Sequence, residues 1–181
     1  MASIAVSIAM PASSGLTFRP AVLADAPLLR RWDDAPHVIE SDPNDDWRWE
    51  IELAETPDWR EQFIAELDGR PIGFLQIIDP AREESRYWGD VPPHLRALDI
   101  WIGEADCLNQ GHGTRMMHFA INRCFADPAV TAILIDPLEG NTRARRFYER
   151  LGFVPVGPRR FGADACFVYT LPRATWLARR A

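Results

Sequence analysis

Two glycines, Gly111 and Gly113, stand one residue apart in the stretch CLNQGHGTRMMHFAINRCF, just before an apolar-periodic segment that predicts a helix from Thr114. The first N–H groups of a helix have no intrahelical partner and lie at the positive end of its dipole. Glycine lacks a Cβ and lets an anion approach such N–H groups closely. The stretch therefore indicates a turn with room for an anion, although two glycines by themselves favour an ordinary turn.

Several kinds of chemistry are excluded by what surrounds the glycines. The spacing is neither GxGxxG nor the GK[ST] of a P-loop, so neither a dinucleotide nor a nucleoside triphosphate is indicated. The chain has no lysine, which excludes a lysine nucleophile or Schiff base. Cys107, Cys124 and Cys166 form no CxxC pair, so we expect buried thiols, no disulfide framework and no metal site.

A second motif follows about 30 residues later, in NTRARRFYERLGF. Its pattern predicts a helix with Asn141 as N-cap and Gly152 at its C-terminal stop. QGHGT together with this motif, which contains Ala144 and Tyr148, resembles the acyl-CoA-binding core of the GNAT N-acetyltransferases. The aminoglycoside 6'-N-acetyltransferase branch is the most similar, with a resemblance from about residue 17 to 171 that includes RALDIWIG and GRPIGFLQ.

The resemblance implies an α/β fold, the GNAT acyl-CoA N-acyltransferase fold, with a mixed and mostly antiparallel sheet flanked by helices. It implies acetyl-CoA as cosubstrate. Backbone N–H groups of the glycine turn would hold the coenzyme A pyrophosphate: Gln110, Gly111, His112, Gly113 and Thr114. The backbone of Ile100, Trp101 and Ile102 would pair with the pantetheine arm, and Asn141 and Ala144 would also contact the cofactor.

Two residues are the catalytic candidates that the resemblance implies. Tyr148 would protonate the departing thiolate, and Asp99 would accept the proton of the attacking amine or hold its ammonium form. A carboxyl group with an ordinary pKa near 3.9 is a poor base at pH 7 unless burial raises that pKa. Both roles of Asp99 therefore stay open.

The acceptor should be a cation. Ten acidic residues against one arginine lie between Asp33 and Asp58, whereas nine arginines against three acids follow Pro137. This separation suits a cationic acceptor and an anionic cofactor. The resemblance places Asp136 at the acceptor amines, and four further residues are candidates for the acceptor side: Trp32, Tyr87, Trp88 and Asp90.

The order of the elements predicts one mixed α/β domain, residues 17–181, after a flexible extension, residues 1–16. A strand and a helix with Asp25 as cap come first, followed by a hairpin around Asp68-Gly69 and a long loop, residues 80–97. Strands follow at Leu98–Gly103 and at residues 129–136, and FVPVG and ACFVYTL close the sheet.

Partners and location follow from charge and hydropathy. The formal net charge of −6 argues against nucleic-acid binding, and no segment of the sequence reads as a membrane span. We expect a cytoplasmic monomer or homodimer. Two alternatives stay open: an acetyltransferase of siderophore hydroxylamine or polyamine metabolism, and a non-catalytic acyl-CoA sensor that keeps the cofactor loop.

Overall fold

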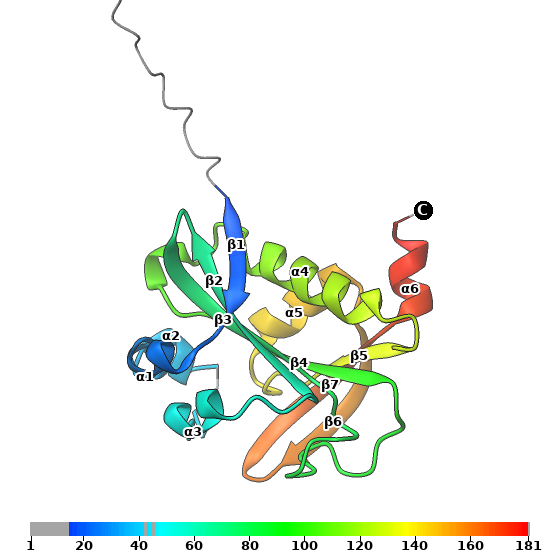
Figure 1. The fold of residues 1–181 in the computed structure, drawn as a ribbon. Coiled ribbons are helices and arrows are strands. Elements are labelled where there is room, and N and C mark those ends of the chain that lie inside the picture. The colour runs from blue at the N-terminus through cyan, green and yellow to red at the C-terminus, as the bar shows by residue number, and fades with distance from the viewer. Residues whose placement is uncertain (1–14, 42, 45, 181) are drawn as a thin grey trace, which may run out of the picture.

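A seven-stranded sheet organises the chain in the computed structural model, which describes residues 15–41, 43–44 and 46–180 (Figure 1). Its order is β1-β2-β3-β4-β5-β7-β6, and β4–β5 is the parallel pair in this otherwise antiparallel sheet. The strands are β1 (Leu16–Pro20), β2 (Arg60–Leu67), β3 (Arg70–Ile78), β4 (Leu95–Ile102), β5 (Ala132–Ile135), β6 (Val154–Phe161) and β7 (Asp164–Pro172).

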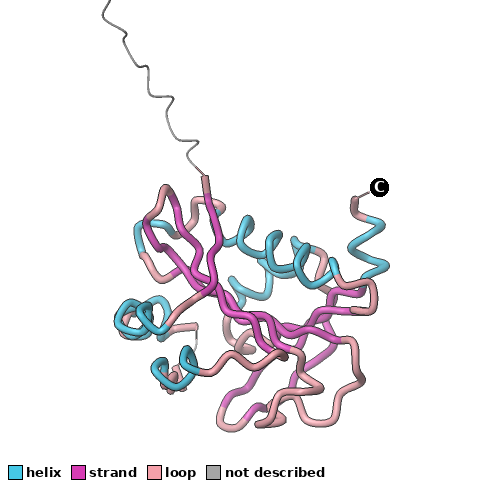
Figure 2. Tube along the Cα trace, in the orientation of Figure 1, coloured by secondary structure: helices cyan, strands magenta, loops and turns pink. Residues whose placement is uncertain are grey.

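Helices cover both faces of the sheet (Figures 1 and 2). They are α1 (Ala26–Asp33), α2 (Pro36–Ile39), α3 (Trp49–Ala54), α4 (His112–Ala126), α5 (Thr142–Leu151) and α6 (Arg173–Ala178), with short 3₁₀ turns at Leu23–Asp25 and Ala105–Cys107. α4 and α5 lie on one face, and α1 and α3 pack on the other. The predicted mixed and mostly antiparallel α/β fold is confirmed.

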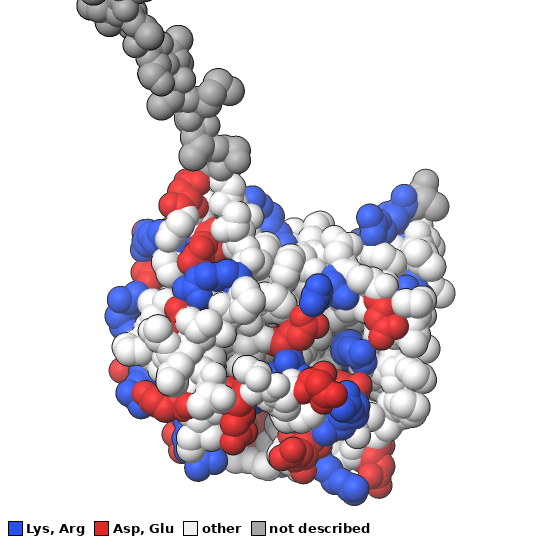
Figure 3. All heavy atoms as spheres, viewed as in Figure 1, with Lys and Arg blue, Asp and Glu red and all other residues white. Residues whose placement is uncertain are grey.

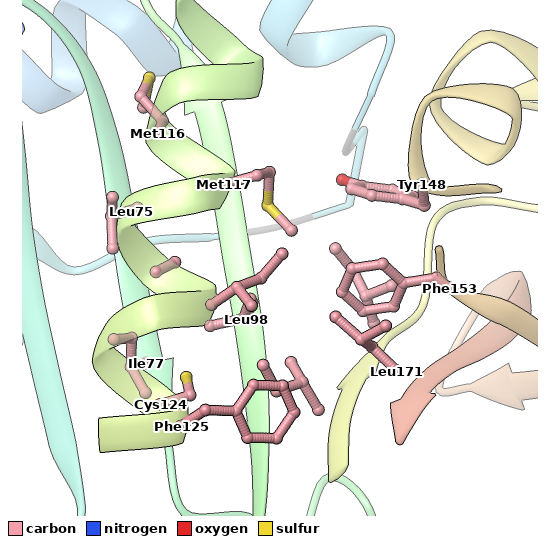
Figure 4. Packing of buried hydrophobic residues seen from close by; sticks show 14 of the residues in the cluster. Leu75, Ile77, Leu98, Met116, Met117, Cys124, Phe125, Tyr148, Phe153 and Leu171 are labelled. Atoms are coloured by element: carbon pink, nitrogen blue, oxygen red, sulfur yellow. The ribbon is translucent and has the colours of Figure 1, made fainter. Parts of the chain in front are cut away.

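The main core lies between the sheet and the α4–α5 layer (Figure 4). Met116 and Met117 of α4 are fully buried there, next to Leu75 and Leu98 of the central strands. A second cluster, built around Trp32, Trp49 and Phe74, fills the opposite face under α1 and α3. Each face of β3 and β4 therefore packs against a helix layer of its own.

The hairpin predicted around Asp68-Gly69 joins β2 to β3. Asp68 has φ 53° and Gly69 has φ 81°, as a two-residue type I′ turn requires. Asp25 does precede α1, but its side chain makes no cap hydrogen bond to that helix. Instead it accepts the N–H of Val22 at 2.9 Å and a bidentate pair from Arg19, so the predicted capping role is wrong.

Several element bounds differ from those predicted. α4 begins at His112 rather than Thr114, because Gly111 adopts the left-handed conformation with φ 82° and turns the chain earlier. β4 begins at Leu95, three residues earlier than predicted, because pairing with β5 recruits Leu95–Ala97. β1 already includes Leu16, and residues 1–14 of the predicted extension lie outside the described residues.

The sheet opens beside its parallel pair. β4 and β5 pair only through Leu95–Ala97 and Ala132–Leu134, and β4 then continues to Ile102 past the end of β5. The second half of β4 therefore presents an edge that β5 does not cover. Within the part of the chain that the structure describes, no helix is long and apolar enough to cross a membrane.

Candidate active site

Asp99 and Asp136 lie at the same level of the sheet on either side of this opening. The last registered pair of the parallel ladder is Ala97 with Leu134, and each aspartate comes two residues later on its own chain segment. Side chains alternate between the faces of a strand, so both carboxylates continue the face of Ala97 and Leu134. That face is the one opposite α4 and α5.

Tyr148 approaches the same opening from the other face. It belongs to α5, is 8% exposed, and packs in the main core with its hydroxyl turned toward α4 (Figure 4). Burial raises the pKa of this phenol, and the negative charges of Asp99 and Asp136 raise it further. The structure thus brings together a protonated phenol and two carboxylates across the opening between β4 and β5.

Asp99 is held by a polar chain that runs across three strands. Gln76, directly opposite on β3, donates its side-chain amide to Oδ2 of Asp99 at 2.6 Å. Gln62 on β2 donates in turn to Oε1 of Gln76 at 3.1 Å. Gln76 is only 3% exposed, and its polar side chain in the apolar run GFLQII was the sequence signal for this role.

Asp136 has its own partner from the long loop between β3 and β4. The hydroxyl of Tyr87 donates to Oδ2 of Asp136 at 2.7 Å. Burial of the phenol and then the charge of Asp136 raise the pKa of Tyr87, with a smaller effect from Asp99. Tyr87 therefore stays protonated and points its hydroxyl at Asp136.

The open edge of β4 carries outward-facing backbone groups. The N–H of Gly103 donates to the carbonyl of Ile72, so alternation turns the backbone groups of Ile100 and Ile102 away from β3. Nε2 of His37, from α2, lies 2.9 Å from the Ile102 carbonyl oxygen, which accepts its N–H. Sequence reasoning missed His37, since nothing local links α2 to β4.

The N-terminus of α4 is the candidate anion site. No side chain of the described residues caps this helix, and a Cβ at Gly111 would meet nothing within 4 Å. A Cβ at Gly113 would make only ordinary contacts with Ile102 and Phe147, at 3.8 Å. The first N–H groups of α4 thus border open space, as close approach of a phosphate requires.

Asn141 caps α5 beside a surface cavity. Its Oδ1 accepts the N–H of Ala144 at 3.0 Å, which confirms its predicted role as N-cap. The cavity has a volume of about 420 Å³ and is lined by Glu40, Leu138, Gly140, Asn141, Thr142, Arg143 and Ala165. Glu40, which sequence reasoning missed, faces the start of α5 across it.

A family model described as acetyltransferase (GNAT) domain matches residues 21–161. The chain belongs to the GNAT acetyltransferase family. It is 29% identical over 165 residues to an aminoglycoside N(6')-acetyltransferase type 1 of Klebsiella pneumoniae, with 83% of this chain and 80% of that protein covered. A lysine N-acyltransferase, MbtK of Mycolicibacterium paratuberculosis, is 30% identical over 148 residues, covering 74% of this chain and 63% of that protein.

Solved structures give the same GNAT fold. A crystal structure of aminoglycoside acetyltransferase AAC(6')-Ib with coenzyme A and kanamycin matches with a TM-score of 0.81 at 26% identity, covering 92% of this chain and 100% of that one. AAC(6')-Ib with ribostamycin and coenzyme A matches with a TM-score of 0.82, also at 26% identity, covering 92% and 98%. Relatives of this GNAT enzyme therefore bind coenzyme A.

The remaining predicted acceptor residues of the GNAT domain lie in different surroundings. Trp32 is 1% exposed, and its indole N–H donates to Oε1 of Glu104 at 2.8 Å. Trp88 is 4% exposed and packs edge-on against Phe161. Asp90 is exposed and pairs with Arg86 at 3.5 Å. Trp32 and Trp88 thus serve packing in this structure, and a direct acceptor contact for any of the three stays a prediction.

Trp101, for which only backbone contacts were predicted, also places an aromatic side chain near Asp99. Its side chain leaves β4 on the face of Asp99 and lies against Phe74, with ring centroids 4.7 Å apart. Trp47 lies next to it at 5.9 Å. The indole N–H of Trp101 is buried without a hydrogen-bond partner among the described atoms. This aromatic wall adjoins Asp99 on the α1–α3 side of the sheet.

The predicted separation of charge is weaker in the folded GNAT domain. On the face in Figure 3, acidic and basic side chains are interspersed. Within the acidic segment, three glutamate or aspartate side chains pair with arginines: Glu50 with Arg30, Glu52 with Arg60 and Asp58 with Arg82. These ion pairs therefore offset part of the negative charge of the acidic segment.

Proposed function

We propose that this enzyme transfers the acetyl group of acetyl-CoA to a primary amine of a cationic acceptor, and that the acceptor is an aminoglycoside acetylated on its 6'-amine. One observation carries the proposal: Asp99 and Asp136 lie at the same level of the sheet on either side of the opening beside β4, close enough to Tyr148 for their charges to raise its pKa. The similarity to aminoglycoside N(6')-acetyltransferases over most of both chains supports the choice of acceptor.

The binding groups divide between the two ends of the opening. The free N–H groups at the start of α4 suit the pyrophosphate, and the outward backbone groups of Ile100 and the outward N–H of Ile102 suit the amides of the pantetheine arm. The acceptor enters from the face of Asp99, where the Trp101 wall lies. Its reacting nitrogen then meets the thioester in the gap between β4 and β5.

The chemical roles follow from the two faces. Asp99, oriented by Gln76, holds the reacting ammonium group and accepts its proton directly or through water. Asp136 holds a second amine of the acceptor. Tyr148, kept protonated by its surroundings, donates its proton to the departing thiolate from the opposite side. Neither proton transfer requires a metal ion.

A lysine-type amine is the second candidate acceptor, because lysine N-acyltransferases match this chain at 25% and 30% identity. Acceptors of this kind carry one or two amines on a flexible chain. Their reacting amine would bind to Asp99 in the same way as the amine of an aminoglycoside. They have no rigid sugar ring, however, that could pack against Trp101. The two candidates therefore differ in the contribution of Trp101 and Asp136.

The deciding experiment measures release of free thiol from acetyl-CoA with kanamycin, ribostamycin, spermidine, lysine and N-hydroxylysine as acceptors. We expect the highest kcat/KM with an aminoglycoside, and mass spectrometry with NMR of the product should place the acetyl group on the 6'-amine. Turnover confined to lysine or N-hydroxylysine would replace the aminoglycoside by the second candidate. Binding of acetyl-CoA without transfer to any amine would support a non-catalytic module instead.

A further inference from the structure

Phe161 ends β6 and is the one buried residue of that strand, all of whose residues the structure describes. Its ring stacks on the ring of Tyr87, with centroids 4.4 Å apart and planes within 8° of parallel. Tyr87 comes from the long loop between β3 and β4, far from Phe161 in sequence. The stack therefore ties that loop to the β6–β7 hairpin.

Arg159 and Trp88 hold Phe161 from its other sides. The guanidinium group of Arg159 lies 4.7 Å from the centre of the Phe161 ring, and its Nη2 donates to the Trp88 carbonyl at 2.6 Å. The ring of Trp88 meets Phe161 edge-on at 5.1 Å. Phe161 is thus fixed by contacts with both the β6–β7 hairpin and the loop between β3 and β4.

The hydroxyl end of Tyr87 reaches Asp136. A phenol has two side-chain torsions, and stacking of its ring on a fixed partner restricts both. The 2.7 Å hydrogen bond from Tyr87 then sets the position of Oδ2 of Asp136. A continuous path therefore runs from Phe161 through the Tyr87 ring to one carboxylate of the acceptor site.

We propose that Phe161 is a positioning residue for the acceptor, which acts through the stacked Tyr87 ring to hold the Asp136 carboxylate in place for an acceptor ammonium group. This inference rests on the proposed function, because it needs Asp136 to bind an amine of the acceptor. Phe161 itself touches neither substrate. Its effect should therefore appear on the acceptor side of the kinetics and depend on Tyr87 and Asp136.

The test is steady-state kinetics of Phe161→Leu with kanamycin and acetyl-CoA. We expect KM for kanamycin to rise about 3- to 10-fold, the range that corresponds to loss of one aromatic pair, while KM for acetyl-CoA stays unchanged. Phe18→Leu is the matched control: Phe18 stacks on Phe119 at 3.9 Å and 7°, away from the site. It should lose comparable thermal stability without a change in either KM.

Double variants separate positioning from simple packing. If Phe161 acts through the path described, Phe161→Leu should change KM for kanamycin less than about 2-fold in a Tyr87→Phe or Asp136→Asn background. A full effect in those backgrounds, or equal rises in both KM values, would overturn the inference. Phe161→Met, whose flexible unbranched side chain adapts to irregular gaps but is not aromatic, provides the same readout if the leucine variant does not fold.

The outcomes also distinguish the inference from the function on which it rests. Wild-type enzyme that releases no thiol with any amine overturns both. Wild-type turnover of kanamycin together with an unchanged kanamycin KM in Phe161→Leu overturns the positioning role alone. All variants are compared at a temperature at least about 10 °C below the lowest Tm of the set, so that each is fully folded in the assay. This margin is about the fall in Tm that two moderately destabilising substitutions cause together.

Discussion

The side chains of Gln76 and Asp99 face each other across the β3–β4 pair and share a hydrogen bond of 2.6 Å. Gln76 is buried and is itself held by Gln62, so its amide points its N–H at the carboxylate. Because the hydrogen bond to Oδ2 fixes the orientation of the carboxylate, its other oxygen also has a defined position. This arrangement suits a group that must receive an ammonium proton at a defined position.

Asp99→Asn should lower kcat by about 10²- to 10⁴-fold, because an amide neither accepts the proton of the amine nor balances its charge. Binding of acetyl-CoA, measured by calorimetry, should be unaffected, since the groups proposed to bind the cofactor lie at α4 and on the backbone of β4. A rate close to that of wild type across a pH series would contradict either role of Asp99.

Gln76→Leu should lower kcat/KM for the acceptor by about 10- to 100-fold, since a hydrogen bond to a charged group contributes about 1.5–3 kcal/mol. Gln62→Leu removes the outer member of the chain and should have a smaller effect. Both variants are assayed with kanamycin at saturating acetyl-CoA. An equal loss of kcat/KM in the two variants would argue that the hydrogen bonds from Gln62 to Gln76 and from Gln76 to Asp99 stabilise the fold rather than orient Asp99.

Tyr148→Phe should slow transfer by about 10²-fold or more while sparing acetyl-CoA binding. Burial and the nearby carboxylates raise the pKa of Tyr148 above its ordinary value near 10, so the proton to be donated is retained through the neutral range. The wild-type rate should therefore show no loss from Tyr148 up to about pH 10. A descending limb near neutral pH that disappears in Tyr148→Phe would refute this assignment.

Gly103→Ala should destabilise the fold by about 1–3 kcal/mol or more, because a Cβ there would lie only 2.0 Å from Cδ2 of the enclosed Trp32 ring. The clash follows from the packing of α1 against the end of β4. Gly140→Ala, whose Cβ would meet nothing within 4 Å, is the matched control and should change stability by less than about 0.5 kcal/mol. Chemical denaturation of both variants measures the difference.

Asp25→Asn should lower the free energy of unfolding at neutral pH, and the difference from wild type should disappear in acid. Burial opposes ionisation of Asp25, but hydrogen bonds from Arg19 and from the Val22 N–H outweigh it and lower its pKa below the ordinary value. A carboxyl group whose pKa is lowered by folding stabilises the fold at pH values above its pKa in the unfolded chain, which is near 3.9. This contribution is lost as the pH falls through the lower pKa of the folded protein. Because Arg19 is about a third exposed, we expect about 1–3 kcal/mol at pH 7.

Denaturation curves of Asp25→Asn and wild type at pH 7, 5 and 3 measure this linkage. The two proteins should approach each other in stability as pH decreases. A difference that stays constant with pH would show that the loss comes from the altered hydrogen bonds and not from the charge of Asp25.

Local features were predictable from the sequence alone. The Asp68-Gly69 turn, the Asn141 cap and the helix that carries Tyr148 each depend on residues within a few positions of one another, and all three form as predicted. The glycine turn before α4 was equally local, and its helix began only two residues early. Such features follow from backbone sterics and short-range hydrogen bonds.

Tertiary structure decided how these parts meet. The level at which Asp99 and Asp136 face each other depends on the register of β4 with β5, which no local pattern specifies. Gln76, His37 and Phe161 acquire their partners through contacts between distant segments, and Trp32 and Trp88 are enclosed for the same reason. The sequence thus determined which groups could do chemistry, and packing between distant segments decided which of them share a site.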